Sequence, residues 1–204
     1  MKQIITIQHC QSQHHVSGMM GGWNDWELTE WGREQARRIG ERLGKELRDT
    51  SVKIFSSDLK RAVQTAAPLA KKLGVVVEYR QELRERCWGP ESIGKSKAWQ
   101  REHQQNRGWL VDQRPLPGAE SKREMYQRLE SMCEEAIACP EDTVVLVSHG
   151  GLLSVWNILW LGLPPEVMDH CGIFGKPGAV GGFDEFEGWE RRVLRICDLS
   201  YCGE

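Results

Sequence analysis

The sequence lacks the features that mark several protein classes. No apolar run approaches the length of a membrane-spanning helix, and the amino terminus enters a short strand without the apolar stretch of a signal peptide. The seven cysteines are an odd number without paired spacing, which favours reduced thiols over a disulfide framework. A net charge of −2 gives no general basic surface, so nucleic acid and membranes are not expected partners. We therefore expect a cytoplasmic protein.

Internal repeats, linkers and low-complexity tracts are also missing. The 204 residues suffice for one domain with a single core, which we expect to span residues 1–204. Apolar segments that resemble strands alternate with segments of helical period. This alternation predicts an α/β fold, a three-layer α/β/α sandwich around a mostly parallel sheet.

The spacing of apolar residues, together with Gly and Pro at segment ends, places the individual elements. Helices are predicted at about 29–47, 59–73, 121–138 and 151–161. Strands are predicted at 4–7, 52–55, 75–77 and 143–147, and an edge hairpin at 179–186 and 191–198. Residues 86–118 carry scattered charges without a clean period, and we interpret them as an inserted helical lid.

Histidines follow two of the apolar strands. His9 comes after 4–7 and His149 after 144–147, and in open α/β sheets chemistry gathers at the carboxyl ends of strands. A third strand leads into a helix whose first turn carries Arg61, where the helix dipole disfavours a cation unless an anion is held nearby. Each histidine alone is more often a structural residue. Together with Arg61, however, the two histidines predict an anion site.

These segments resemble the histidine phosphatase superfamily, the phosphoglycerate-mutase-like phosphatases, whose first motif is Arg-His-Gly followed by small polar residues. Further matching blocks occur in family order at residues 28–36, 56–66, 83–85, 117–121 and 148–151. The resemblance implies a phosphomonoesterase that acts on a small-molecule phosphate ester and needs no cofactor. It also implies a phosphohistidine intermediate.

By the same resemblance, His9 is the nucleophile, and His149 and Arg61 donate hydrogen bonds to the phosphoryl oxygens. Glu85 stands where the family has the acid that protonates the leaving oxygen and later activates water. The alternative for Glu85 is a solvated charge flanked by Arg84 and Arg86. The candidate substrate-binding residues surround the first motif and are Gln8, Gln11, Ser12, His15, Gly22 and Trp23.

Two residues of the first motif depart from the family. Gln8 replaces the arginine, which removes a cation and a bidentate phosphate donor. Loss of one preorganised donor typically costs about a hundred- to thousandfold in rate, so we expect a slow phosphatase unless Arg84, Arg86 or a lid arginine supplies the charge. A natural and an engineered Gln8 look alike in the sequence. Cys10 can replace the usual glycine if its φ angle stays negative.

The sequence contains nine tryptophans. Trp23 follows the first motif, and Trp88, Trp99 and Trp109 lie in the 86–118 segment. Packing in the core and loops is the ordinary role of such side chains. The alternative is an aromatic cleft in which Trp23 and one of the central three hold the part of the substrate beyond its phosphate.

Other functions stay open at this point. His9, Cys10, His14 and His15 are potential metal ligands, but their spacing matches no standard zinc pattern and no carboxylate cluster lies nearby, so no metal site is predicted. A phosphoglycerate-type mutase is one alternative, although residues 117–121 are closer to the phosphatase pattern. A noncatalytic phosphate-ligand binder with a decayed site at Gln8 is another. A homodimer and the identity of the substrate stay open.

Overall fold

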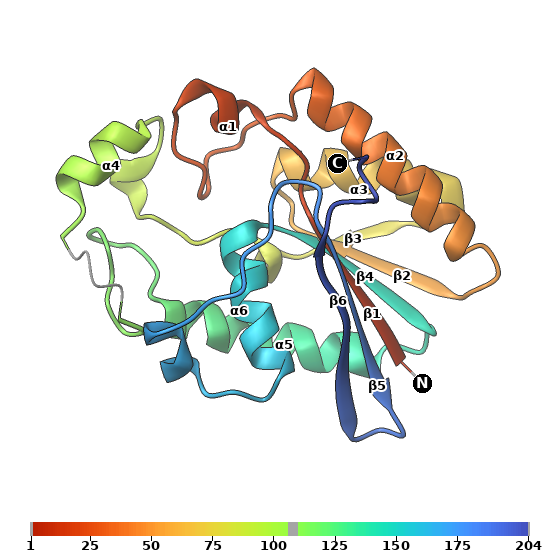
Figure 1. The fold of residues 1–204 in the computed structure, drawn as a ribbon. Helices are drawn as coiled ribbons and strands as arrows, with labels where there is room; N and C mark the ends of the chain where they lie inside the picture. The colour runs from red at the N-terminus through yellow and green to blue at the C-terminus, as the bar shows by residue number, and fades with distance from the viewer. Residues whose placement is uncertain (1, 106–109, 204) are drawn as a thin grey trace.

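The computed structural model describes residues 2–105 and 110–203. A six-stranded sheet in the order β3-β2-β4-β1-β5-β6 forms its centre, and helices cover both faces (Figure 1). The parallel strands are β1 (Lys2–Gln8), β2 (Val52–Ser56), β3 (Val77–Tyr79) and β4 (Thr143–Ser148). The antiparallel edge hairpin consists of β5 (Val180–Phe186) and β6 (Glu190–Asp198). The predicted α/β sandwich with a mostly parallel sheet and an edge hairpin is confirmed.

The central strands β1 and β4 are apolar on both faces. In β1, Ile4 belongs to the core under one helical layer, whereas Ile5 and Ile7 belong to the core under the other. A strand that is buried on both faces reads as a continuous apolar run, as seen here. The register pairs Gln8 with Ser148, so the residues that follow these two strands emerge side by side.

Helices α2 (Glu30–Glu46) and α3 (Lys60–Leu73) cover one face of the sheet (Figure 1). Thr29 caps α2 by accepting a hydrogen bond from the Gly32 amide at 3.0 Å. The two helices approach closely at Gly40, where a Cβ atom would lie 2.8 Å from the Leu69 amide nitrogen. Only glycine fits this contact without a shift. The close contact fixes the two helices against each other near Pro68 and Leu69 of α3.

Helices α5 (Lys122–Ala138) and α6 (Gly150–Trp160) cover the opposite face. A capping box between Ser121 and Glu124 starts α5. Trp156 and Trp160 of α6 pack against Phe183 of β5 with ring centroids 6.3 and 5.6 Å apart, which fixes α6 on the sheet directly after His149. The four predicted helices are confirmed, with boundaries that agree within one residue.

Two parts of the prediction differ from the structure. The strand predicted at 75–77 begins at Val77, because the Val75 amide bonds to Ala70 and closes the end of α3 after Gly74 turns in the left-handed region. The short helix α1 (Gln13–Ser17) was not predicted. Within the described residues, no helix is long and apolar enough to cross a membrane.

The segment 86–118 is largely loop. Its described residues, 86–105 and 110–118, contain the seven-residue helix α4 (Lys97–His103) and the 3-10 turn η2 (Pro90–Ser92). Residues 106–109, which include Trp109 of the predicted tryptophan cluster, lie outside the described residues. Two further 3-10 turns, η1 (Gln81–Leu83) and η3 (Pro165–Asp169), precede the site segments described below.

Candidate active site

His9 and His149 lie next to each other at the carboxyl ends of β1 and β4. The His9 amide donates to the Ser148 carbonyl at 2.8 Å, and the two imidazole rings meet edge to face with centroids 5.0 Å apart. Both side chains are buried. The register of two central strands thus brings together residues that are 140 positions apart in the sequence.

The His9 ring is held in one orientation. Nδ1 lies 2.8 Å from the Cys10 carbonyl oxygen, which can only accept, so Nδ1 carries the proton and Nε2 keeps its lone pair. Burial, assisted by the charge of Arg61, holds the pKa of His9 well below its ordinary value. His9 is therefore a neutral imidazole whose Nε2 is unprotonated, the form that a nucleophile requires.

Arg61 is fixed in the first turn of α3 beside His9. Its Nε donates to His9 Nε2 at 3.2 Å, while Nη1 and Nη2 donate to the carbonyls of Asn24 and Gly22 at 2.8 and 2.7 Å. Burial lowers the pKa of Arg61 to about 10, and Glu85 and Asp25 oppose the shift. The guanidinium stays charged at neutral pH. Gly22 acts here through its backbone oxygen.

His149 presents an unused donor. Its Nε2 lies 2.9 Å from the Ser57 hydroxyl, and that hydroxyl accepts from the Leu59 amide at 3.3 Å. We assign the Ser57 proton to His149 Nε2, which leaves the ring proton on Nδ1. Within the described residues, Nδ1 is buried without a hydrogen-bond partner. A buried donor without an acceptor is costly, and a phosphoryl oxygen would satisfy it.

Glu85 lies on the far side of Arg61, between two backbone donors. Oε1 accepts from the Arg86 amide at 2.8 Å and Oε2 from the Gly151 amide at 3.1 Å. A Cβ atom at position 151 would lie 2.4 Å from Glu85 Oε1, so glycine is needed for this close approach. These contacts tie the half-buried Glu85 side chain to the start of α6.

A cavity of about 640 Å³ adjoins this group of residues. Arg61, Glu85 and His14 line it. His9 lies next to Arg61 and His14. The 86–118 segment contributes Trp88, Lys97 and other residues to its wall. We use the name inner cluster for His9, Arg61, Glu85 and His149. The structure thus brings the four predicted catalytic residues together at one end of a cavity large enough for a small organic molecule.

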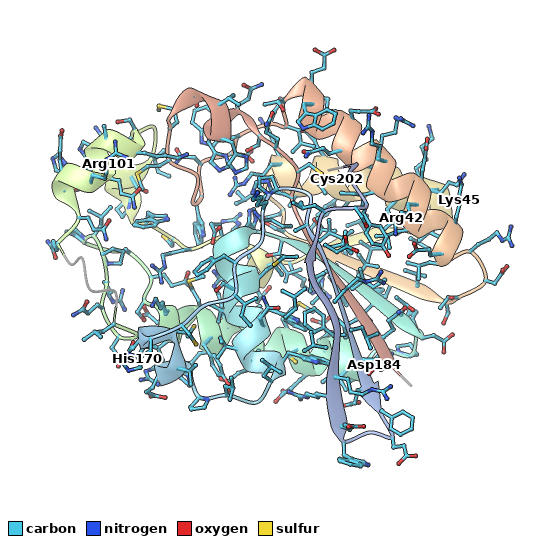
Figure 2. All side chains as sticks on the ribbon, viewed as in Figure 1. Arg42, Lys45, Arg101, His170, Asp184 and Cys202 are labelled. Carbon is cyan, nitrogen blue, oxygen red and sulfur yellow. The ribbon has the colours of Figure 1, made fainter. Side chains whose placement is uncertain are left out.

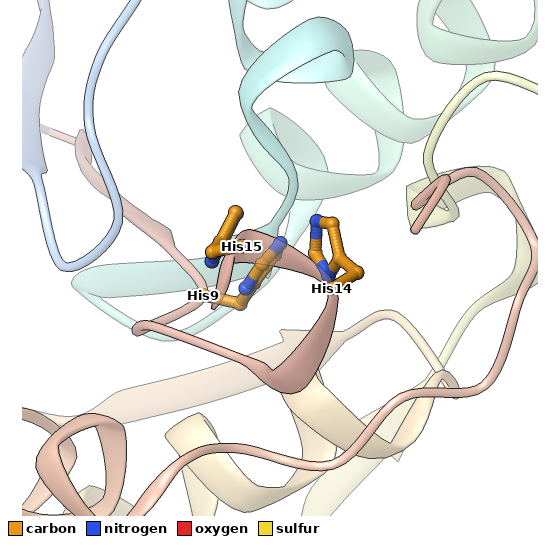
Figure 3. Close-up of side chains that lie close together, drawn as sticks. All are labelled: His9, His14 and His15. Atoms are coloured by element: carbon orange, nitrogen blue, oxygen red, sulfur yellow. The ribbon is translucent and has the colours of Figure 1, made fainter. Parts of the chain in front are cut away.

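His14 and His15 lie beside His9 (Figure 3), and Ser12 contacts both of them. The Ser12 amide donates to His15 Nδ1 at 3.0 Å, and Ser12 Oγ lies 2.6 Å from His14 Nδ1. The His15 ring stacks on His9 with centroids 5.4 Å apart. Burial lowers the pKa of His14 to about 2 and of His15 to about 4. All three imidazoles are neutral at pH 7.

The three histidines each offer a nitrogen within 4.8 Å of the others, a spacing that a metal ion could bridge after a small contraction. Two of the lone pairs are already engaged, since His9 Nε2 accepts from Arg61 and His15 Nδ1 accepts from the Ser12 amide. The cation of Arg61 also lies within hydrogen-bond distance. These contacts fit an anion pocket better than a metal site.

Three of the predicted substrate-binding side chains lie elsewhere. Gln8 lies under the start of α6 and lines a separate void of about 20 Å³. The Gln11 side-chain oxygen accepts from the Thr29 hydroxyl at 2.7 Å and joins the loop to α2. Trp23 is 38% exposed, and its indole N–H donates to the Glu85 carbonyl at 2.8 Å. The direction of these side chains depends on tertiary packing, which the motif does not specify.

The central tryptophans divide in the same way. Trp88 lines the cavity, whereas Trp99 stacks on His103 with centroids 4.5 Å apart.

Arg84, a proposed replacement for the missing arginine, is held by both carboxylate oxygens of Asp58 at 2.6 Å. Arg86 is buried and lines the cavity, so Arg86 is the better placed of the two.

Cys10 keeps a negative φ angle, as its occurrence in place of glycine requires, since the non-glycine residues with positive φ in the described chain are Glu187 and Cys197. Its amide donates to the Thr65 hydroxyl at 3.0 Å, and its side chain packs into the core under α2 and α3. Burial raises the pKa of the thiol to about 12.

Several residues of the site could not be identified from the motifs. Ser57, which orients His149, and the cations Lys97, Arg101 and Lys122 of the cavity wall were not predicted. The spacing of four between Lys97 and Arg101 could have indicated that both lie on one helical face. Ser57 carried no comparable signal.

Comparison with known proteins identifies the family. A family profile described as "Histidine phosphatase superfamily (branch 1)" matches residues 4–196. The chain therefore belongs to the histidine phosphatase superfamily. The family resemblance inferred from the motifs is confirmed.

Among its relatives is the glucosyl-3-phosphoglycerate phosphatase of Mycobacterium tuberculosis, 32% identical over 195 residues that cover 86% of this chain and 82% of the relative. The probable phosphoglycerate mutase GpmB of Erwinia tasmaniensis is 31% identical over 169 residues, covering 80% and 77% of the two chains. A solved structure of mycobacterial glucosyl-3-phosphoglycerate phosphatase with VO3 superimposes with a TM-score of 0.81 at 27% identity, over 96% of this chain and 98% of that one. Phosphatases and mutase-like proteins are thus both among the homologues, and a phosphatase hydrolase is the class that they support.

Proposed function

We propose that this protein hydrolyses a small phosphorylated metabolite through a phosphohistidine formed on His9. The observation that carries the proposal is the His9 ring, whose Nδ1 proton is held by the Cys10 carbonyl while the Nε2 electron pair lies beside Arg61. A nucleophile positioned next to a fixed cation is what transfer of a negatively charged group requires.

In the first step, His9 Nε2 attacks phosphorus and the bond to the ester oxygen breaks. The electron pair of that bond goes to the leaving oxygen, which takes a proton from Glu85 in its acid form. Arg61 and the Nδ1–H of His149 donate to the phosphoryl oxygens. His149 is suited to this role because its Nδ1 is buried and lacks an acceptor within the described residues.

In the second step, water attacks the phosphohistidine. The Glu85 carboxylate takes a proton from the water, the phosphorus–nitrogen bond breaks, and its electron pair returns to His9 Nε2. The backbone donors Arg86 N and Gly151 N keep Glu85 in place for both steps. The products are inorganic phosphate and the alcohol, and no metal or cofactor takes part.

The segment 86–118 acts in this proposal as a lid that contributes the outer part of the cavity. Gln8 leaves the phosphoryl group with one guanidinium fewer than the family pattern provides, and we expect turnover to be slow for that reason. Arg86, buried on the cavity wall, is the cation that compensates in part.

The test is a rapid quench in base followed by mass spectrometry, because phosphohistidine survives base and not acid. With p-nitrophenyl phosphate at mildly acidic pH, phosphate should be found on the peptide that contains His9. Undiminished turnover in a His9→Ala variant would remove the whole mechanism.

Gln8 also favours the alternative of a noncatalytic phosphate-ligand binder. Such a protein would bind p-nitrophenyl phosphate without releasing p-nitrophenol. A phosphoglycerate-type mutase would instead transfer phosphate between hydroxyls of phosphoglycerate faster than it releases inorganic phosphate. Product analysis with both substrates separates the three functions.

A further inference from the structure

The cavity is far larger than a phosphate group needs, and its charge is unbalanced. Beyond Arg61, four cations line it, namely Arg86, Lys97, Arg101 and Lys122, whereas Glu85 is the one carboxylate among the lining residues. Arg61 and Glu85 offset each other. A phosphoryl dianion would neutralise only part of the remaining positive charge, so the cavity favours a ligand with further negative charge.

Lys97 and Arg101 are available for such a group. They lie one turn apart on α4, half-buried and exposed respectively. Neither forms an ion pair with a carboxylate within residues 2–105 and 110–203. By contrast, Arg84 is paired with Asp58, and Lys122 donates to the Met168 carbonyl. Unpaired cations on a cavity wall are expensive to desolvate unless an anion enters with them.

The rest of the wall is apolar. Met20, Trp88, Met125, Val155, Met168 and Phe174 line it. The uncharged hydrogen-bonding side chains on the described wall are few, chiefly His14, Gln100 and Ser154, and His14 already lies within hydrogen-bond distance of Ser12. A sugar would lose water from its hydroxyls without finding enough partners here, whereas an apolar body would gain from burial.

Figure 2 shows that α4 and the turn η3, which both contribute to this wall, lie on one side of the molecule. Arg101 lies on α4, and His170 lies next to η3, the turn from which Met168 reaches the cavity. Both are on the opposite side from Arg42 and Lys45 of α2. The cationic helix and the apolar turn thus belong to the same flank as the cavity.

We propose that the substrate of this protein is an amphiphilic phosphate ester, with an apolar body against Trp88 and Met168 and a second anionic group bound by Lys97 and Arg101. That this ligand is a substrate rests on the proposed phosphatase function. The binding preference itself rests on the cavity alone. A sugar-bearing ester would fit this cavity less well, because the wall offers few hydrogen-bond partners to hydroxyl groups.

Hydrolysis-resistant phosphonates test the inference without requiring turnover. Binding of n-hexylphosphonate, of the same chain with a terminal carboxylate, and of a hexose phosphonate is measured by isothermal titration calorimetry. We expect the carboxylated chain to bind about tenfold more tightly than the plain chain, the scale of one charge-assisted contact. The hexose compound should bind most weakly.

Variants then locate the second group. In Lys97→Gln and in Arg101→Gln, the affinity ratio between the carboxylated and plain chains should fall toward one. Lys95→Gln is the matched control, since Lys95 is an exposed lysine of the same segment whose ammonium faces the Trp99 ring. It should keep the ratio of the unaltered protein.

Three outcomes would overturn the inference: equal affinity for the carboxylated and plain chains, tighter binding of the hexose compound, or equal weakening of both chains in Lys97→Gln. The last would mean that Lys97 serves the phosphoryl group itself. Failure of the proposed function gives a different result. In that case p-nitrophenyl phosphate would release no phosphate, while the preference among the phosphonates would persist.

Discussion

The inner cluster and the outer wall of the same cavity are held in place by different means. His9, Arg61 and Glu85 are fixed by backbone groups: the Cys10 carbonyl, the carbonyls of Gly22 and Asn24, and the amides at positions 86 and 151. On the wall, Lys97 and Arg101 belong to a seven-residue helix within a loop segment. The proposed catalytic groups thus have little freedom, whereas the proposed second anion site lies on a segment that can change without disturbing the sheet.

The largest expected effect comes from removing the nucleophile. His9→Ala should lower kcat by more than about ten-thousandfold, since residues that act as a unit in covalent catalysis lose nearly all activity together. The fold should persist, which circular dichroism would check. Steady-state release of p-nitrophenol measures the loss, and residual turnover near that of the unaltered protein would contradict the role of His9.

Gln8→Arg should act in the opposite direction. If the longer arginine side chain extends from the void beside α6 to the phosphoryl group, kcat/KM should rise about a hundred- to thousandfold, the scale of one preorganised donor. Most of the gain should appear in kcat, because the negative charge on the transferring group is matched better in the transition state. The Gln8 amide lies against Gly150 and Gly175, where added Cβ atoms would come within 2.9 Å of it. Gln8→Lys is the control for a positive charge without the paired donors of a guanidinium. No gain in either variant would mean that Gln8 does not limit the enzyme.

Ser57→Ala tests the tautomer of His149. Without the Ser57 hydroxyl at 2.9 Å, the ring can place its proton on Nε2, and the donor toward the phosphoryl group is lost in part of the molecules. Removing a partner that orients a functional group typically costs about ten- to a hundredfold. We expect kcat to fall while KM changes little. Ser57→Thr keeps the hydroxyl and should restore part of the rate, which loss of packing alone would not allow.

Trp88→Ala probes the outer wall. The KM for an apolar ester should rise roughly tenfold, because the contact with the indole is lost. The kcat for p-nitrophenyl phosphate should change much less. A fall in kcat for both esters would show that wall and inner cluster are coupled more tightly than their contacts suggest.

Chelation should have the smallest effect. Phosphoryl charge in this mechanism is met by Arg61, His149 and backbone donors, and two of the three clustered histidines use their lone pairs within the protein. Activity in EDTA should equal activity in buffer. Loss of activity with recovery on adding a divalent ion would assign the histidine cluster to a metal after all.

The same contrast governs what the sequence could predict. His9, His149 and Arg61 follow apolar strands or open a helix, so local pattern and strand-end geometry place them together. Thr29, Ser121 and Gly74 mark helix ends by local chemistry, and these ends were found. The directions of Gln8, Gln11 and Trp23 depend on contacts with segments far along the chain, namely α6, Thr29 and Glu85. The composition of the wall could not be predicted, because it combines residues from segments far apart in the chain, such as Met20, Lys97 and Met168.

The buried Cys10 has a consequence for redox chemistry. Thiolates, not thiols, react quickly with peroxide and alkylating reagents, and burial raises the pKa of the Cys10 thiol to about 12. Although this sulfur belongs to the residue next to the nucleophile, it stays protonated at any physiological pH and is shielded under α2 and α3. We therefore do not expect oxidants or alkylating reagents to modify Cys10 in the folded protein, in contrast to an enzyme whose nucleophile is a cysteine.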